Sequence, residues 1–183
     1  MNAAAIAALS ISLMAVAAAT LSVRAAQPTR PAPPPRGDAP GDFALIGTDF
    51  RDPANVLDDF HDAAARADFA RYFSHWTPES VFLGTDATER WVGGEFEAFA
   101  RPHFDAGKGW TYRARERRIS TAPGGQTAYF DELLENAKLG TCRGSGVLHL
   151  VDGEWKILQY NLSIPIPNDK AAEVAGIIAA PKP

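Results

Sequence analysis

The segment "SGVLHLVDGEWKILQYNLSIP", Ser145 to Pro165, predicts a β-hairpin whose strands meet at Asp152 and Gly153. An Asp-Gly pair between two alternating apolar runs is typical of a two-residue hairpin loop. Because side chains alternate along strands, the residues paired across this loop should share one face of the sheet. The predicted pairs are Leu150 with Trp155, Leu148 with Ile157, Gly146 with Gln159, and Gly144 with Asn161.

This predicted face changes character along its length. Near the loop it is large and apolar, whereas at the far end two amides, Gln159 and Asn161, stand opposite Gly146 and Gly144. Glycine leaves space and amides offer fixed hydrogen bonds, so the pattern predicts a ligand cavity, with Trp155 on its apolar side. Valine at position 146 should then fill the cavity and leave the fold intact. Alternatively, the two amides only reach the wet end of the sheet.

Helices should precede the strands. Asp52 can cap a helix that has Pro53 at its first position, a second helix should start at Asp68, and a third is predicted over residues 93–105. Strands are predicted over residues 79–86, 110–120, 126–136 and 141–151, and Arg113, Arg115 and Arg117 should lie on a solvated face. Helices followed by a run of antiparallel strands predict an α+β fold.

Composition limits the function classes. The 183 residues are 46% hydrophobic, which is enough for one packed domain, and the net charge of −4 argues against nucleic acid or anionic membranes as partners. The one cysteine, Cys142, cannot form an internal disulfide. The histidines show no metal-ligand spacing, so we predict no metal site and no cofactor.

The N-terminal part predicts export. Residues 1–26 contain an uncharged, alanine-rich run and resemble a signal peptide, although an uncleaved anchor is the alternative. Residues 27–50 form a proline-rich linker, residues 51–168 the folded domain and residues 169–183 a tail. The mature protein should be periplasmic or secreted, without membrane contact, and start near Ala26, which an intact-mass measurement tests.

Three segments together resemble a known family. The segments "VLDDFHDAAARADFARYFSHWTPESVFLGTD", "ERWVGGEFEAFARPHF" and "DGEWKILQYNLS" are similar to the SnoaL-like branch of the nuclear transport factor 2 (NTF2-like) superfamily, over about Asp52 to Ser163. The resemblance implies a cystatin-like cone, in which a curved antiparallel sheet wraps around helices and encloses a pocket. Relatives include ketosteroid isomerases, polyketide cyclases and dehydratases, but other members bind ligands or assemble without catalysis, so the fold alone does not assign a function.

The resemblance also raises the question of which group transfers a proton. Many relatives have a histidine where this chain has Asn161, so an acid or base must come from elsewhere. A turn at residues 137 and 138 would pair Asp131 with Gly144 and point this carboxylate inward as a general base, with Tyr129 beside it as a donor. A register shifted by one residue would exchange Asp131 and Glu132. Alternatively, both carboxylates only form surface ion pairs with arginines.

Two functions of different class remain open. In the first, the domain binds a small, largely apolar carbonyl compound and transfers a proton as an isomerase, cyclase or dehydratase does; a buried Asp131 would favour it. In the second, it is a non-catalytic ligand-binding or dimerising module, which an Asp131 bridged to arginine would favour. Glu89 is a weaker candidate for the acid, and a helix-leading or solvated charge is its predicted role. The aromatic residues other than Tyr129 are predicted to belong to the core: Trp76, Trp91, Trp110 and Tyr112. A homodimer is predicted through apolar positions on the back of the sheet: Val147, Leu158, Tyr160 and Leu162.

Overall fold

The structure is a computed structural model that describes residues 49–180. The predicted signal segment, residues 1–26, lies outside this range, as do residues 27–48 of the predicted linker and the last three residues of the predicted tail. In the described part of the chain, no helix combines the length and the apolar character that crossing a membrane requires.

The first three helices begin within one residue of the predicted positions. Asp52 accepts a hydrogen bond from the backbone N–H of Ala54 at 2.8 Å and caps α1 (Pro53–Ala65). After α1, Ala67 adopts a left-handed conformation with φ 54°, and Asp68 caps α2 (Phe69–Ser74). The third helix, α3, spans Gly94–Asp105. After the last strand come a short 3-10 helix, η1 (Asn168–Lys170), and α4 (Ala171–Ala179), which buries none of its residues.

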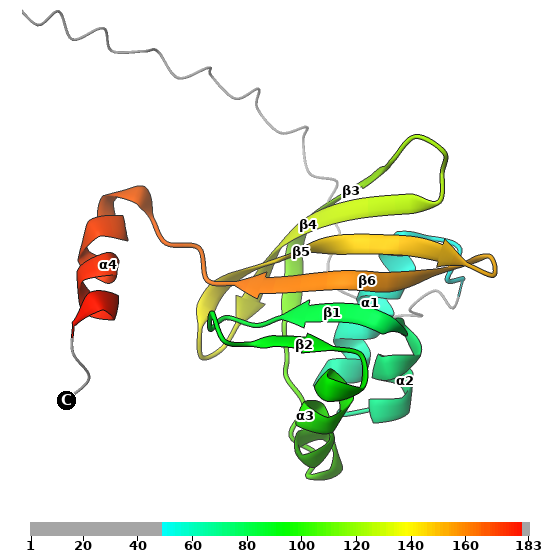
Figure 1. The fold of residues 1–183 in the computed structure, drawn as a ribbon, viewed down its shortest axis with the longest axis horizontal. Coiled ribbons are helices and arrows are strands. Elements are labelled where there is room, and N and C mark those ends of the chain that lie inside the picture. Colours follow the sequence, from blue (N-terminus) through cyan, green and yellow to red (C-terminus); the bar gives the residue numbers. More distant parts are fainter. Residues whose placement is uncertain (1–48, 181–183) are drawn as a thin grey trace, which may run out of the picture. The chain divides into compact units, whose positions relative to one another are not determined.

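Six strands form one curved sheet in the order β2-β1-β6-β5-β4-β3 (Figure 1). Neighbouring strands are antiparallel except β1 and β6, which are parallel, so the sheet is mixed and not purely antiparallel as predicted. The α+β class is confirmed. The strands are β1 (Trp76–Leu83), β2 (Arg90–Val92), β3 (Arg113–Thr121), β4 (Thr127–Asn136), β5 (Gly140–Val151) and β6 (Glu154–Ser163).

The hairpin between β5 and β6 agrees with the prediction only near its loop. Asp152 and Gly153 both have positive φ, 52° and 85°, as a two-residue hairpin loop requires. The first two predicted pairs are confirmed, but the register then shifts between Ile157 and Gln159. Beyond this bulge Gly146 pairs with Tyr160 and Gly144 with Leu162, so the predicted pairing of the two glycines with amides is wrong. The observed pairs include Leu150 with Trp155, Leu148 with Ile157, Val147 with Gln159, Gly146 with Tyr160, Ser145 with Asn161, and Gly144 with Leu162.

A second bulge changes which residues of β3 face inward. Its register against β4 shifts between Ala114 and Glu116. Arg117, which alternation placed on the solvated face, instead lies opposite Glu132, with a side chain only 13% exposed. A bulge inserts one extra residue into one strand, so every residue beyond it changes face.

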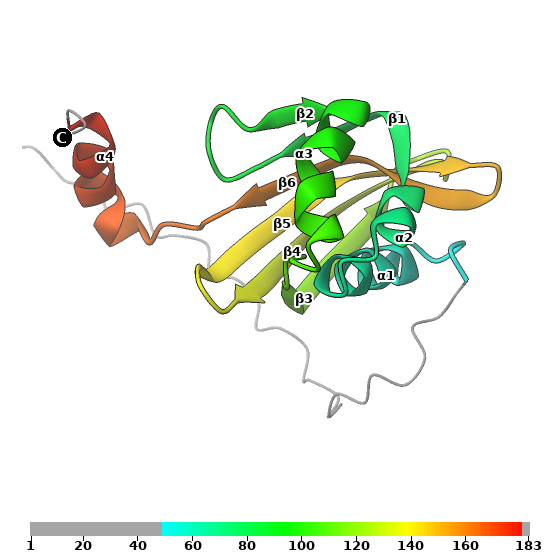
Figure 2. The ribbon, with the colours of Figure 1, turned by 90° about the horizontal axis from the view of Figure 1, so that it is seen from below.

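Helices α1, α2 and α3 all cover the same face of the sheet, which we call the inner face (Figure 2). The core between these layers is rich in aromatic rings: Phe82 and Phe96 stack at 4.2 Å between centroids, and Phe60 stacks on Tyr72 at 4.6 Å. Tyr160, predicted on the back of the sheet, belongs to this core, as does Leu162. The predicted dimer patch therefore loses half of its members.

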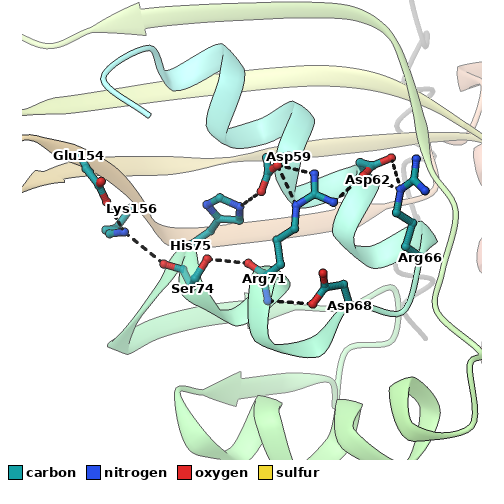
Figure 3. A network of polar contacts seen from close by, with 9 residues as sticks. All are labelled: Asp59, Asp62, Arg66, Asp68, Arg71, Ser74, His75, Glu154 and Lys156. Carbon is teal, nitrogen blue, oxygen red and sulfur yellow. Dashed lines mark hydrogen bonds and ion pairs between the residues drawn. The ribbon is translucent and has the colours of Figure 1, made fainter. Parts of the chain in front are cut away.

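A polar network ties α1 to α2 (Figure 3). The guanidinium of Arg71 on α2 donates hydrogen bonds to Asp59 and, at 2.6 Å, to Asp62, both on α1. The other carboxylate oxygen of Asp59 lies 2.6 Å from Nε2 of His75, whose pKa is lowered chiefly by burial. Because these buried contacts hold α1 in a fixed position, they also fix the side chains that α1 presents to the sheet.

Candidate functional site

A cavity of about 180 Å³ lies between the helices and the inner face of the sheet. Phe60 and His61 come from α1 and Tyr72 from α2, whereas Tyr160 and Leu162 come from β6. Among the lining residues Thr85 and Phe99 are exposed, so the mouth of the cavity lies beside them. The remaining lining residues are Phe82, Gly84, Glu89, Trp91, Phe96, Trp110 and Tyr112.

A buried carboxylate, Glu132 on β4, joins groups from α1, β3 and β6 behind this cavity. Its Oε1 lies 2.7 Å from Nε2 of His61 and accepts a hydrogen bond from the Tyr160 hydroxyl at 2.8 Å. Its Oε2 accepts a hydrogen bond from Nε of Arg117 at 2.7 Å. Arg117 in turn pairs with Asp58 at 2.6 Å. We call His61, Glu132, Tyr160 and Arg117 the Glu132 cluster.

The Glu132 side chain is ionised within this cluster. Burial by itself would raise the pKa of Glu132, but His61 and Arg117 outweigh burial and lower the pKa to about 2. An ionised carboxylate only accepts hydrogen bonds, so Nε2 of His61 must carry the proton that it shares with Glu132. Burial, and then the charge of Glu132, raise the pKa of Tyr160 well above its ordinary value, so its hydroxyl stays protonated.

The second ring nitrogen of His61 is the group in the cluster that is available for chemistry. Nδ1 makes no hydrogen bond to any residue between 49 and 180 and is not shut off from solvent. Because Nε2 directs its proton to Glu132, Nδ1 carries the lone pair whenever the imidazole is in its neutral form. A histidine held in one tautomer by a buried carboxylate, on the wall of an apolar cavity, can act as a general base.

Tyr72 contributes an unpaired hydroxyl to the same cavity. The side chain is completely buried, and within the described range its hydroxyl has no hydrogen-bond partner of acceptable geometry. Burial raises the pKa of Tyr72 well above its ordinary value, which the nearby Trp110 indole offsets only in part. A buried hydroxyl without a partner costs free energy, so a bound molecule with an acceptor atom would satisfy it.

The sequence-predicted polar residues lie together, but on the outer face of the sheet. Paired residues form two rows across strands β4, β5 and β6. One row contains Asp131, Ser145 and Asn161, and the next contains Tyr129, Val147 and Gln159. The Asp131 side chain is 53% exposed and lies 3.7 Å from Arg118, and Tyr129 is 57% exposed. The predicted inward orientation of Asp131, Tyr129, Gln159 and Asn161 is therefore wrong, because β4 takes the alternative register and β6 contains the bulge.

The remaining predicted residues do lie on the inner face, without lining the cavity. Trp155 is buried and donates its indole N–H to the backbone oxygen of Arg51 at 3.0 Å. A Cβ atom on Gly144 would lie 2.2 Å from the Tyr160 hydroxyl and 2.9 Å from Oε1 of Glu132. Gly144 therefore makes room for the Glu132 cluster and not for a ligand. A Cβ atom on Gly146 would lie 2.0 Å from the backbone oxygen of Gln159.

Sequence reasoning missed His61, Tyr160 and Tyr72. The sequence does contain a signal for Glu132, because a register shifted by one residue turns Glu132 inward in place of Asp131. His61 and Tyr160 lie 71 and 28 positions away from Glu132, so no local motif joins them to it. Aromatic residues that the sequence assigned to the core, among them Trp91 and Trp110, also line the cavity.

Solved structures resemble the fold at low sequence identity. A candidate dehydratase of the NTF2-like family from Streptomyces avermitilis has a TM-score of 0.55 at 16% identity, covering 66% of this chain and 98% of its own. A candidate aromatic ring hydroxylase from Novosphingobium aromaticivorans has a TM-score of 0.54 at 16% identity, covering 65% and 90%. An NTF2-like protein of unknown function from Pseudomonas putida KT2440 has a TM-score of 0.54 at 11% identity, covering 64% and 87%.

At these identities the structural similarity shows the fold alone. No curated protein sequence matches the chain. The SnoaL-like domain, in contrast, matches residues 54–167, which is more than half of the sequence. The chain therefore belongs to the SnoaL-like domain family, and its fold is that of NTF2-like proteins.

Proposed function

We propose that the domain binds a small, largely apolar carbonyl compound in the aromatic cavity and transfers a proton on it, with His61 as the base. The observation that carries this proposal is the position of His61, which lines the cavity while the ionised Glu132 holds its Nε2. Two structural relatives are named as a candidate dehydratase and a candidate hydroxylase, which is compatible with chemistry in this cavity but assigns none.

The size of the cavity limits the ligand. An apolar cavity of about 150 Å³ in another protein accommodates benzene. The cavity here measures about 180 Å³, so it suits a molecule with one ring and a few substituents. A steroid or a fused polyketide would have to leave most of its surface outside the mouth.

The polar groups suggest how a proton would move. Nδ1 of His61 would accept a proton from the carbon next to the ligand carbonyl, and the proton would then return to another carbon. The Tyr72 hydroxyl, buried and unpaired among the described residues, would donate a hydrogen bond to the oxygen that gains negative charge. Tyr160 cannot take this role while it donates to Glu132, so it positions the carboxylate instead.

The first test fills the cavity. Leu162→Trp places an indole in the cavity, so a small molecule that co-purifies with the wild-type protein should be absent from the variant in native mass spectra. Leu158→Trp is the matched control, because Leu158 lies in the same strand but does not line the cavity. Adducts that persist in a folded Leu162→Trp protein would show that the cavity is not the binding site.

The second test concerns proton transfer. The probe is cyclohex-3-en-1-one, a one-ring ketone whose isomerisation to the conjugated enone is followed by ultraviolet absorbance. His61→Asn should lower turnover by about 10²- to 10⁴-fold, the range of a lost general base, and leave affinity within about tenfold. Asp131→Asn, on the outer face, should leave turnover unchanged. Loss of turnover in Asp131→Asn alone would assign the base to Asp131 and overturn this proposal.

The alternative function is a dimerising module without catalysis, and the outer face of the sheet supports it. Tyr129 is 57% exposed there, with Val147 beside it on the neighbouring strand. We propose that two copies pair through this face, so Tyr129→Glu should shift a dimer to a monomer in sedimentation-equilibrium measurements. A wild-type protein that is monomeric at the highest concentration studied would remove this alternative.

Export of the chain is also a proposal.

A further inference from the structure

The lining of the cavity contains an acidic side chain but no lysine or arginine. Glu89 supplies the one carboxylate in this lining. Glu89 forms no ion pair with any residue that the structure describes between 49 and 180. Its Oε2 accepts a hydrogen bond from the backbone N–H of Asp86 at 3.1 Å, and its Oε1 makes none within this range. The cavity therefore contains a carboxylate that pairs with no lysine or arginine among residues 49–180.

The carboxylate of Glu89 is held in place by its own loop. The N–H of Gly84 donates to the backbone oxygen of Glu89 at 2.9 Å, and the N–H of Glu89 donates to the backbone oxygen of Asp86 at 3.0 Å. A Cβ atom on residue 84 would lie 2.1 Å from Oε2 of Glu89. Any side chain other than glycine at position 84 would thus displace the carboxylate from the cavity wall.

Aromatic rings surround the space next to this carboxylate. Nine of the 14 lining residues are aromatic, and Trp91, Trp110 and Tyr112 are among those that retain partial exposure. Burial, the Cys142 thiol and the charge of Glu89, in that order, raise the pKa of Tyr112, so the field of Glu89 reaches this ring. The faces of aromatic rings attract cations, tryptophan most strongly, and aromatic cages are known sites for quaternary ammonium groups.

We infer that the ligand of this cavity carries a quaternary or protonated amine, which lies against Glu89 and the partly exposed rings near the mouth. This inference rests on the proposed function, because it concerns the ligand of the same cavity. The apolar remainder of the molecule extends toward Tyr72 and His61. The carboxylate of Glu89 repels carboxylates and phosphates, so we expect anionic compounds to bind more weakly than neutral ones.

The test compares two probes of equal shape in calorimetric titrations of the full chain. Choline carries a quaternary nitrogen, and 3,3-dimethylbutan-1-ol has a neutral carbon in the same position. Choline should bind at least about tenfold more tightly than the neutral probe, since both the rings and the carboxylate favour the positive charge. Equal or tighter binding of the neutral alcohol would overturn the inference.

Two variants separate the contribution of the Glu89 carboxylate to choline binding from that of the aromatic rings. Glu89→Gln should weaken choline by about tenfold or more and leave the neutral probe unchanged, whereas the exposed Glu97→Gln on α3 should change neither affinity. If Glu89→Gln fails to fold, Tyr112→Leu provides the second test, because it keeps an apolar wall but removes a ring face; choline should again lose more affinity than the alcohol. Equal losses for both probes would contradict the inference.

A panel of neutral one-ring compounds, benzyl alcohol and indole, separates this inference from the proposed function. If the panel binds and choline does not, the amine assignment is wrong and the ligand-binding proposal stands. If neither the panel nor the two matched probes bind, both proposals fail.

Discussion

Glu132→Gln should lower the free energy of unfolding near pH 7 by about 3 kcal/mol, because it removes the central charge of a buried cluster and leaves Arg117 without its main partner. Glu132 is only 1% exposed, so water cannot replace the lost contacts. Urea denaturation followed by tryptophan fluorescence measures the change. Asp131→Asn is the matched control: it alters the neighbouring carboxylate on the outer face and should stay within about 0.5 kcal/mol of the wild type.

Glu132 should also make the free energy of unfolding depend on pH in the acid range. The folded protein holds the pKa of Glu132 at about 2, below the ordinary 4.5, so the unfolded state binds a proton first as pH falls. The contribution of ionised Glu132 to the free energy of unfolding is therefore complete above pH 4.5 and is lost as the pH falls through 2. The difference between the two pKa values corresponds to about 3 kcal/mol. Glu132→Gln should lack this part of the acid dependence. Parallel stability curves for the two proteins between these pH values would contradict the assignment.

Gly146→Ala should destabilise the fold by about 3 kcal/mol, although alanine is the smallest possible addition. Its Cβ atom would lie 2.0 Å from the backbone oxygen of Gln159 and 3.0 Å from the ring of Phe130. The backbone oxygen belongs to the bulged part of β6 and cannot move without breaking the pairing with β5. Thermal unfolding followed by circular dichroism measures the loss.

Gly94→Ala is the control for this prediction. A Cβ atom on Gly94 meets nothing within 4 Å, and the residue lies in helix α3, so alanine there should be neutral or stabilise slightly. A Gly146→Ala protein as stable as Gly94→Ala would show that the two strands separate easily at the bulge. The geometry also contradicts the sequence-based expectation that valine at position 146 would only fill a cavity.

The elements that the sequence predicted correctly depend on local chemistry. Asp52 and Pro53 begin α1 because an aspartate cap and a proline at the first helical position act within one turn. Asp152 and Gly153 form the hairpin loop because their own backbone conformations suit it. With the other predicted helices and strands, these signals give the α+β class, although they did not predict β2 or α4.

The candidate site was predicted only in part. The sequence predicts an inward carboxylate in β4 and leaves Asp131 and Glu132 as alternatives that differ by one residue of register. A loop of three residues between Asn136 and Gly140 selects Glu132, which pairs with Gly144. His61 could not be predicted, because its role depends on the packing of α1 against β4 across 71 positions of sequence.

The tertiary structure alone decided to which side of the sheet the residues after each bulge point. Alternation in the sequence correctly predicted Trp155 and Ile157 as inward residues, up to the bulge that precedes Gln159. The residues at the two bulges, Leu158 and Arg115, have ordinary strand side chains and no local signal for an extra residue. A sheet that curves around three helices requires such insertions, and each one reverses the alternation after it. The bulges thereby turn Tyr160 and Arg117 toward Glu132 and leave Gln159 and Asn161 on the outer face.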